Sequence, residues 1–197
     1  MARFPKSILS LLTVLFLASC ATTTVSVEKN TNPAFGEALT RLFVEVDAGD
    51  WKCSYNAGSS DSPVWKEIPL ADYLTAAIEK KFQENGVDTK AIRLNQVDVD
   101  QVQIMKEINE FGAAVMEVHL TEAVVTPDRY VLHGIFDVSV HDISDKSAYW
   151  RAKITVDGGK SYIFYPVAID QSKVVDSIVS GLQKDGLMTA PAPAGAH

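Results

Sequence analysis

Hydrophobic and polar residues alternate along three stretches in the second half of the chain, at 113–125, 130–142 and 148–157. In the middle stretch one set of alternating positions is apolar or small: Leu132, Gly134, Phe136, Val138 and Val140. The positions between them include four polar residues: His133, Asp137, Ser139 and His141. Such alternation predicts antiparallel strands that pack on helices with one face and meet water with the other. Turn-forming residues between the stretches join them into a meander.

Apolar residues recur every three or four positions in three other segments, which predicts amphipathic helices. The first helix ends at Asn85-Gly86, and its apolar face is Leu70, Tyr73, Leu74, Ala77, Ile78 and Phe82. The second opens with a capping box of Asp100 and Gln103, and its expected inward face is Val102, Met105 and Ile108, with Phe111 as a further candidate. The last helix follows the N-cap Asp170 and carries the stripe Val174, Val175, Ile178 and Leu182.

Two more strands are predicted at 41–46 and 90–94, so the order is strand, helix, strand, helix, three strands, helix. The two β-α repeats at the start favour parallel pairing of the first strands. The expected fold class is therefore α/β (α+β), a single small domain at residues 38–187. It should contain a mixed sheet of about five strands, with the helices packed on one face.

A long connection at 49–69 holds Trp51, Tyr55 and Trp65 among small and polar residues. Its length predicts either a small hairpin or a functional loop. Exposed aromatic residues are common anchors of interfaces, so one hypothesis is a partner-binding tip. The alternative is that these three side chains cover an open end of the core.

The N-terminal segment has the features of a secretory signal peptide at residues 1–19. Arg3 and Lys6 precede an apolar run at 8–17 that is too short to span a bilayer. The run ends in Leu17-Ala18-Ser19-Cys20, which resembles the lipobox of bacterial lipoproteins. The resemblance implies thioether diacylation of Cys20, cleavage before it, and acylation of the new amine.

This resemblance implies that the protein is attached to a membrane. Two or more acyl chains hold a protein stably on a bilayer. An aspartate after the cysteine is the usual inner-membrane retention signal of such lipoproteins, and Ala21 stands there instead. The expected location is the outer membrane of a bacterial cell envelope, facing the periplasm. Residues 20–37 are expected to form a flexible tether and the Ala/Pro-rich residues 188–197 a disordered tail.

The charge and the cysteine content of the chain limit the classes of partner that it is expected to bind. Without residues 1–19 the chain has 197 − 19 = 178 residues and a charge of 16 − 25 = −9. An acidic surface argues against nucleic acid or anionic headgroups as partners. With Cys20 acylated, Cys53 has no partner for an intrachain disulfide, so it is either buried and inert or free to pair with another chain.

Two runs resemble a group of envelope proteins that includes the TolB N-terminal domain, LpoB and CsgG. The run at 111–118, FGAAVMEV, is similar to the group's entry into the meander, and the run at 136–150 is similar to its later hairpin. The resemblance implies a non-catalytic domain that binds other envelope proteins or helps to assemble a complex.

One polar row could carry chemistry. If Thr126 pairs with Tyr130 across the first bend, His119 lies opposite Asp137, and Asp137 lies beside Lys153. The row is either an acid-base or metal cluster or ordinary cross-strand charge pairing. The chain has no Gly-x-Ser-x-Gly elbow, Walker loop or Cys-x-x-Cys pair. We therefore expect no catalytic, cofactor or metal site.

The leading hypothesis is a lipid-anchored envelope protein, not an enzyme, that binds another envelope protein through its domain. Its contact surface would be the loop from Trp51 to Trp65 or the open face of the meander. The alternatives are a periplasmic carrier of a small apolar ligand and a hydrolase that uses the row of His119 and Asp137.

Overall fold

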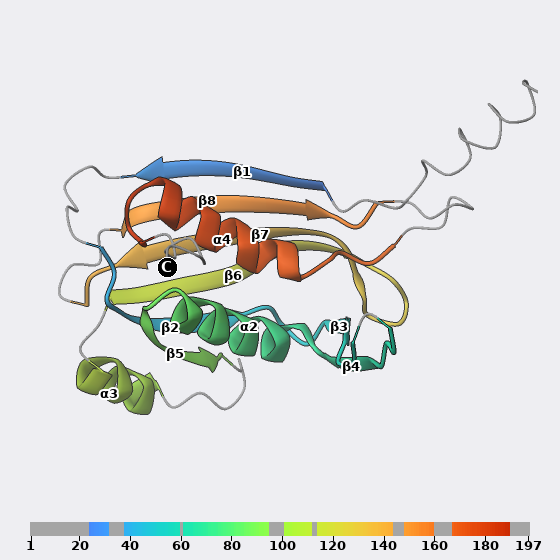
Figure 1. Cartoon of the computed structure of the whole chain (residues 1–197), viewed down its shortest axis with the longest axis horizontal. Coiled ribbons are helices and arrows are strands. Elements are labelled where there is room, and N and C mark those ends of the chain that lie inside the picture. Colours follow the sequence, from blue (N-terminus) through green and yellow to red (C-terminus); the bar gives the residue numbers. More distant parts are fainter. Residues whose placement is uncertain are drawn as a thin grey trace, which may run out of the picture.

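A six-stranded mixed sheet forms the centre of the domain, in a computed structural model that describes residues 24–31, 38–59, 61–94, 101–111, 114–143, 148–159 and 167–189. Its strands lie in the order β1-β8-β7-β6-β2-β5 (Figure 1). Their bounds are β1 Thr24–Thr31, β2 Arg41–Asp47, β5 Asp88–Arg93, β6 Ala114–Val125, β7 Val131–His141 and β8 Ala148–Asp157. Residues 1–23, which include the predicted signal peptide and Cys20, and residues 190–197 of the predicted tail lie outside the described part.

The pairing of the strands follows the predicted order. Strand β2 pairs in parallel with β5 and with β6, as expected for two β-α repeats. Strands β6, β7 and β8 form the antiparallel meander. The predicted fold class, a mixed α+β single domain, is confirmed.

Two helices cover one face of the sheet, α2 (Leu70–Glu84) and α4 (Ser172–Lys184) (Figure 1). Side chains from both helices and from the sheet form a continuous core between them. The bulkiest fully buried members include Trp150, Phe82, Phe136, Leu74, Ile178 and Leu182. The apolar stripes and the alternation predicted from the sequence thus meet in one core.

The third helix, α3 (Gln101–Phe111), packs on the opposite face of the sheet. Ile108 is buried there with Phe43 and Val115, and the Phe111 ring meets that of Phe43 edge-on at 6.2 Å between centroids. The expectation that all helices pack on one face is therefore wrong for α3. Phe43 explains the difference. Successive side chains of a strand point to opposite faces of the sheet, so Phe43 on β2 points away from the main core and places an apolar ring on the other face, which α3 covers.

The inward face predicted for α3 was also partly wrong. Ile108 is buried, but Val102 is 78% exposed and Met105 is 51% exposed. The helix is turned so that Ile104, Ile108 and Phe111 face the sheet. The predicted face through Met105 and the observed face through Ile104 both have helical spacing, so periodicity alone did not distinguish them.

The predicted flexible tether at 20–37 contains a strand. Strand β1 pairs antiparallel with β8 over its whole length, from Thr24 opposite Asp157 to Thr31 opposite Trp150. It therefore forms an edge of the sheet. The segment was missed because its β-branched residues are interspersed with polar ones and gave no clear apolar period.

The long connection between β2 and α2 forms the hairpin that was one of its two predicted alternatives. Strands β3 (Lys52–Asn56) and β4 (Trp65–Pro69) pair antiparallel as a separate two-stranded sheet. A backbone hydrogen bond from Lys52 N to Arg129 O, 2.9 Å long, ties the base of the hairpin to the bend between β6 and β7. Figure 1 shows the hairpin at one end of the central sheet.

Candidate interaction surfaces

The three aromatic residues singled out in the hairpin have different surroundings. Trp51 is half-buried against the core, with the Arg129 guanidinium 5.7 Å from its ring centroid. Tyr55 rests on Tyr73 of α2, with 5.7 Å between ring centroids. Trp65 is 68% exposed. Only Trp65 is thus presented openly to solvent, whereas Trp51 covers the end of the core and Tyr55 supports the hairpin.

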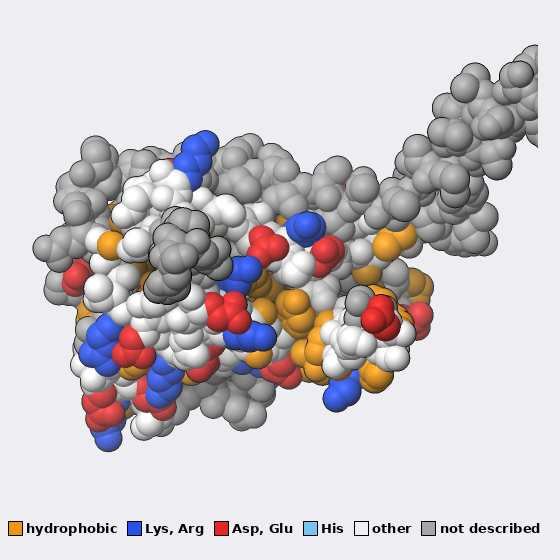
Figure 2. All heavy atoms as spheres, viewed as in Figure 1, with side chains coloured by type: hydrophobic (Ala, Val, Ile, Leu, Met, Phe, Trp, Pro, Cys, Tyr) orange, Lys and Arg blue, Asp and Glu red, His pale blue; other side chains and the backbone are white. Residues whose placement is uncertain are grey.

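The tip of the hairpin is held by one side chain. The Asn56 Oδ1 accepts hydrogen bonds from the backbone N–H groups of Gly58 and Val64, both 2.9 Å long. A Cβ added at Gly58 would lie 2.2 Å from the Ser62 carbonyl oxygen, so the turn requires glycine there. The turn places Val64, which is 52% exposed, beside Trp65. Hydrophobic side chains gather on this end of the molecule, around β3 and β4 (Figure 2).

A hollow of about 750 Å³ lies between the hairpin and the start of α4. Tyr55, Trp65 and Tyr73 contribute its aromatic wall, and the residues that open α4 form the other side. Gln171 joins the two walls, because its Nε2 donates to the Ser54 carbonyl oxygen at 2.8 Å. The hairpin is therefore fixed to α4 as well as to the β6–β7 bend.

The polar row on the open face of the sheet has the predicted register. His119 lies opposite Asp137, and Asp137 lies opposite Lys153. The register extends the row to Asp47 on β2 and to Glu28 on β1. The open face is thus crossed by a line of alternating acidic and basic positions.

One ion pair is found in this row among the described residues. The closest ion pair of His119 joins its Nδ1 to Asp47 Oδ2 at 3.7 Å, and no hydrogen bond joins it to Asp137 among the described residues. The Ser139 hydroxyl, in an adjacent row, donates a hydrogen bond of 3.2 Å to Glu117 Oε2. A hydroxyl bonded to a carboxylate instead of an imidazole lacks the arrangement of an activated nucleophile.

A second polar row lines a cavity of about 350 Å³ between α3 and the open face. Glu45 and Glu117 lie opposite each other on the parallel strands β2 and β6. Burial raises the pKa of Glu45, the charge of Glu117 raises this pKa further, and His119 partly lowers it. Arg151 also lines the cavity, and no ion pair between it and either glutamate is found among the described residues. Two neighbouring carboxylates thus face the cavity, and neither forms an ion pair within the part of the chain that the structure describes.

The described residues give little support for metal binding or for thiol chemistry. The described ranges contain no group of three or more His, Cys, Asp and Glu side chains that could hold a metal ion. Cys53 is buried, as one of the two predicted alternatives required. Burial, followed by the charge of Asp72, raises the pKa of its thiol to about 12, so the thiol stays protonated at neutral pH.

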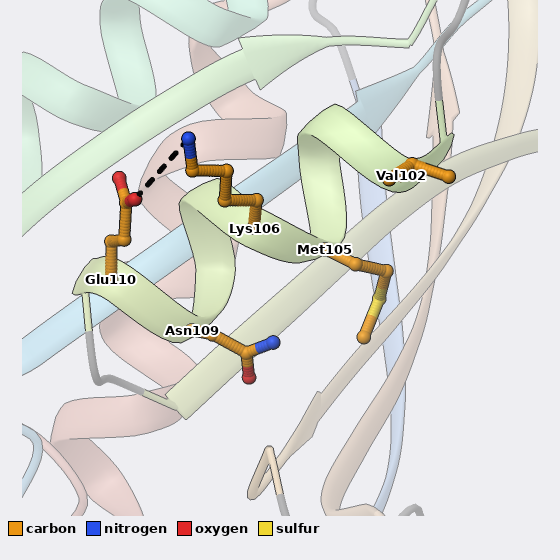
Figure 3. Close-up of a pocket in the computed structure, with 5 residues that line it drawn as sticks. All are labelled: Val102, Met105, Lys106, Asn109 and Glu110. Carbon is orange, nitrogen blue, oxygen red and sulfur yellow. Dashed lines mark ion pairs between the residues drawn. The ribbon is translucent and has the colours of Figure 1, made fainter.

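The outer side of α3 carries a further shallow hollow of about 680 Å³ (Figure 3). Val102 and Met105 supply its apolar part, and an ion pair of 3.8 Å joins Lys106 Nζ to Glu110 Oε1 beside it. These residues all lie on one helix.

Sequence reasoning missed several exposed residues of these surfaces. Val64 and Val124 are 52% and 57% exposed. Neither was singled out, because an apolar residue type by itself does not indicate exposure. Glu45 was assigned to a strand, but its position opposite Glu117 depends on parallel pairing of β2 with β6, whose register no short turn specifies.

No protein-family model matches the chain. No curated protein matches it either. Two crystal structures of the PelC dodecamer from Paraburkholderia phytofirmans are similar to it. A PelC variant is 14% identical, with a TM-score of 0.46 over 81% of this chain and 96% of that chain. Another PelC structure is 13% identical, with a TM-score of 0.44 over 81% of this chain and 95% of that one. Similarity this remote carries no functional inference.

The helices of the described residues are too short or too polar to cross a membrane.

Proposed function

We propose that the chain is a lipid-anchored protein of the bacterial outer membrane, facing the periplasm, whose domain binds another envelope protein without catalysing a reaction. The observation that carries this proposal is the sequence Leu17-Ala18-Ser19-Cys20 after a basic and then apolar segment. Acyl chains on Cys20 would keep the domain at a membrane, where a binding function needs only a suitable surface.

The open face of the sheet is the surface that we assign to a protein partner. Its rows are half-buried and rigidly spaced by the strand register, and Glu45 and Glu117 face the cavity beside α3. Basic side chains of a partner would complement these carboxylates and favour the charged form of Glu45. We therefore expect a partner segment that carries lysine or arginine.

Lipidation is tested by metabolic labelling. Cells that express the full chain and receive labelled palmitate should incorporate the label into the protein. The Cys20→Ala variant should incorporate none and should appear in the soluble fraction, because the thioether cannot form. Palmitate in the variant, or its absence from the wild type, would refute the anchor. Cys53 is a natural control, since its buried thiol is unavailable for acylation.

The protein contact is tested by cross-linking in intact cells, with mass spectrometry to identify the cross-linked protein. Reversing one charge with Glu117→Lys should lower the cross-linked yield about tenfold or more, because like charges would then meet across the interface. The matched control is Glu84→Lys on the outer side of α2, where the carboxylate pairs only loosely with Lys80 at 3.9 Å. Equal yields from the two variants would exclude the open face as the contact.

A further inference from the structure

The position of β1 determines where an anchor would leave the domain. Thr24, the first residue of β1, pairs with Asp157, the last residue of β8. Asp157 pairs in turn with His133, and His133 pairs with Val124 near the end of β6. Thr24 therefore lies at the same end of the sheet as the bend between β6 and β7.

The chain between Cys20 and Thr24 is short. Four residue steps separate the two positions, and an extended chain of that length spans at most about 14 Å. A cysteine whose acyl chains lie in a bilayer is held at the bilayer surface. This end of the sheet would therefore stay within about 14 Å of the lipid, and the domain could not rise far from it.

The same end of the domain presents exposed apolar side chains. Among the described residues, five large hydrophobic side chains are exposed, and three of them, Val64, Trp65 and Val124, lie at this end. Val124 is on β6 beside the bend, and the hairpin that carries Val64 and Trp65 is bonded to the same bend through Lys52. Figure 2 shows hydrophobic side chains around this hairpin.

The side chains at this end favour contact with lipid through apolar burial and not through attraction between net charges. Basic Lys52 and Lys66 are balanced nearby by acidic Asp61 and Glu67. Tryptophan favours the headgroup region of a bilayer, where its ring is buried and its N–H remains hydrated. Contact would thus depend on burial of the apolar side chains.

We propose that the hairpin tip and the β6–β7 bend contact the membrane surface, with Trp65 inserted at the headgroup level as a second attachment point beside the lipidated Cys20. This inference rests on the proposed anchor at Cys20. Strands β1 and β6 are three positions apart in the sheet, which corresponds to about 14 Å. The anchor and the β6–β7 bend are thus at separate points of this end, and two separate attachments fix the orientation of the domain and leave the opposite end and the open face available to a protein partner.

The test uses the full chain purified from membranes and reconstituted into phosphatidylethanolamine and phosphatidylglycerol vesicles with dibrominated acyl chains, which quench tryptophan fluorescence on contact. One of three tryptophans should be reached, so the wild type should lose up to about a third of its emission relative to vesicles without bromine. Trp150 is fully buried and should not be quenched. The Trp65→Phe variant should lose almost none of its emission.

A matched control moves the exposed indole to the other end of the domain. The double variant Trp65→Phe and Asn109→Trp keeps three tryptophans but places one on α3, near Phe111, whose ring lies under Arg41 at the first residue of β2. The control should show no more quenching than Trp65→Phe. Equal quenching in the control and the wild type would overturn the proposed orientation.

The intact mass of the same sample distinguishes the two proposals. If the mass includes the acyl chains but the wild type is not quenched, the contact at Trp65 is refuted and the anchor stands. If the mass shows no acyl chain, the anchor is refuted, and the membrane contact that rests on it falls with it.

Discussion

Replacing Trp150 with alanine should lower the free energy of unfolding by about 3–5 kcal/mol, the range measured for removal of a large aromatic side chain from a core. Trp150 is fully buried on β8, in the core beneath α2 and α4. Its Nε1 donates a hydrogen bond of 2.9 Å to Asp185 Oδ2, just beyond the end of α4. The substitution would therefore open a cavity and also remove a link between α4 and the sheet.

Urea unfolding followed by circular dichroism measures this change. Trp65→Ala is the control, because it removes the same side chain from a position that is 68% exposed and should change stability by less than about 0.5 kcal/mol. Trp150→Phe should fall between the two, since it keeps most of the apolar volume and loses the hydrogen bond. A similar loss in Trp150→Ala and Trp65→Ala would show that α4 does not pack on β8 as described.

The meander could be predicted because two independent signals agree there. The alternation of Phe136, Val138 and Val140 with polar residues predicts which face is buried, and the structure buries all three. The short bend between Thr126 and Tyr130 sets the register, and a hydrogen bond of 2.8 Å from Thr126 N to Tyr130 O closes it. His119 pairs with Asp137 as that bend predicts, because the two register shifts between them, at Leu120/Glu122 and at Val124/Val125, cancel.

The errors arose where the sequence carried one signal or none. The spacing on α3 fits a stripe through Met105 as well as one through Ile104, and contact with Phe43 decides between them. Strand β1 is an edge strand defined by its pairing with β8, a partner more than a hundred residues away in the chain. Long-range pairing of this kind leaves no local pattern to read.

The candidate surfaces could also be predicted only in part. Trp65 was singled out as an aromatic residue in a long loop, and the structure leaves it exposed. Trp51 was singled out by the same criterion, yet it is half-buried against the core. Composition identified both residues, but the difference in their exposure depends on the path of the chain at the hairpin.

Replacing Gly158 with alanine should destabilise the domain by about 3 kcal/mol, at the upper end of the cost of overpacking. A Cβ at this position would lie 1.8 Å from the Val167 carbonyl oxygen and 2.7 Å from the Ala168 carbonyl carbon. Both are backbone atoms, so no side-chain rotation can relieve the contact. The backbone there is also held from both sides, since Gly158 N donates to Leu132 O and Ile169 N donates to Val131 O, each at 2.8 Å.

The comparison with Gly86→Ala separates crowding from backbone strain. Gly86 has a φ of +80° and no atom within 4 Å of an added Cβ, so alanine there should cost only the left-handed penalty of about 1–2 kcal/mol. Thermal or urea unfolding of the two variants should therefore rank Gly158→Ala as the less stable. If Gly158→Ala proves equally or more stable, residues 167–169 must be able to move away from β7. The start of α4, and with it the hydrogen bond from Gln171 to the hairpin, would then be held less firmly than these backbone contacts imply.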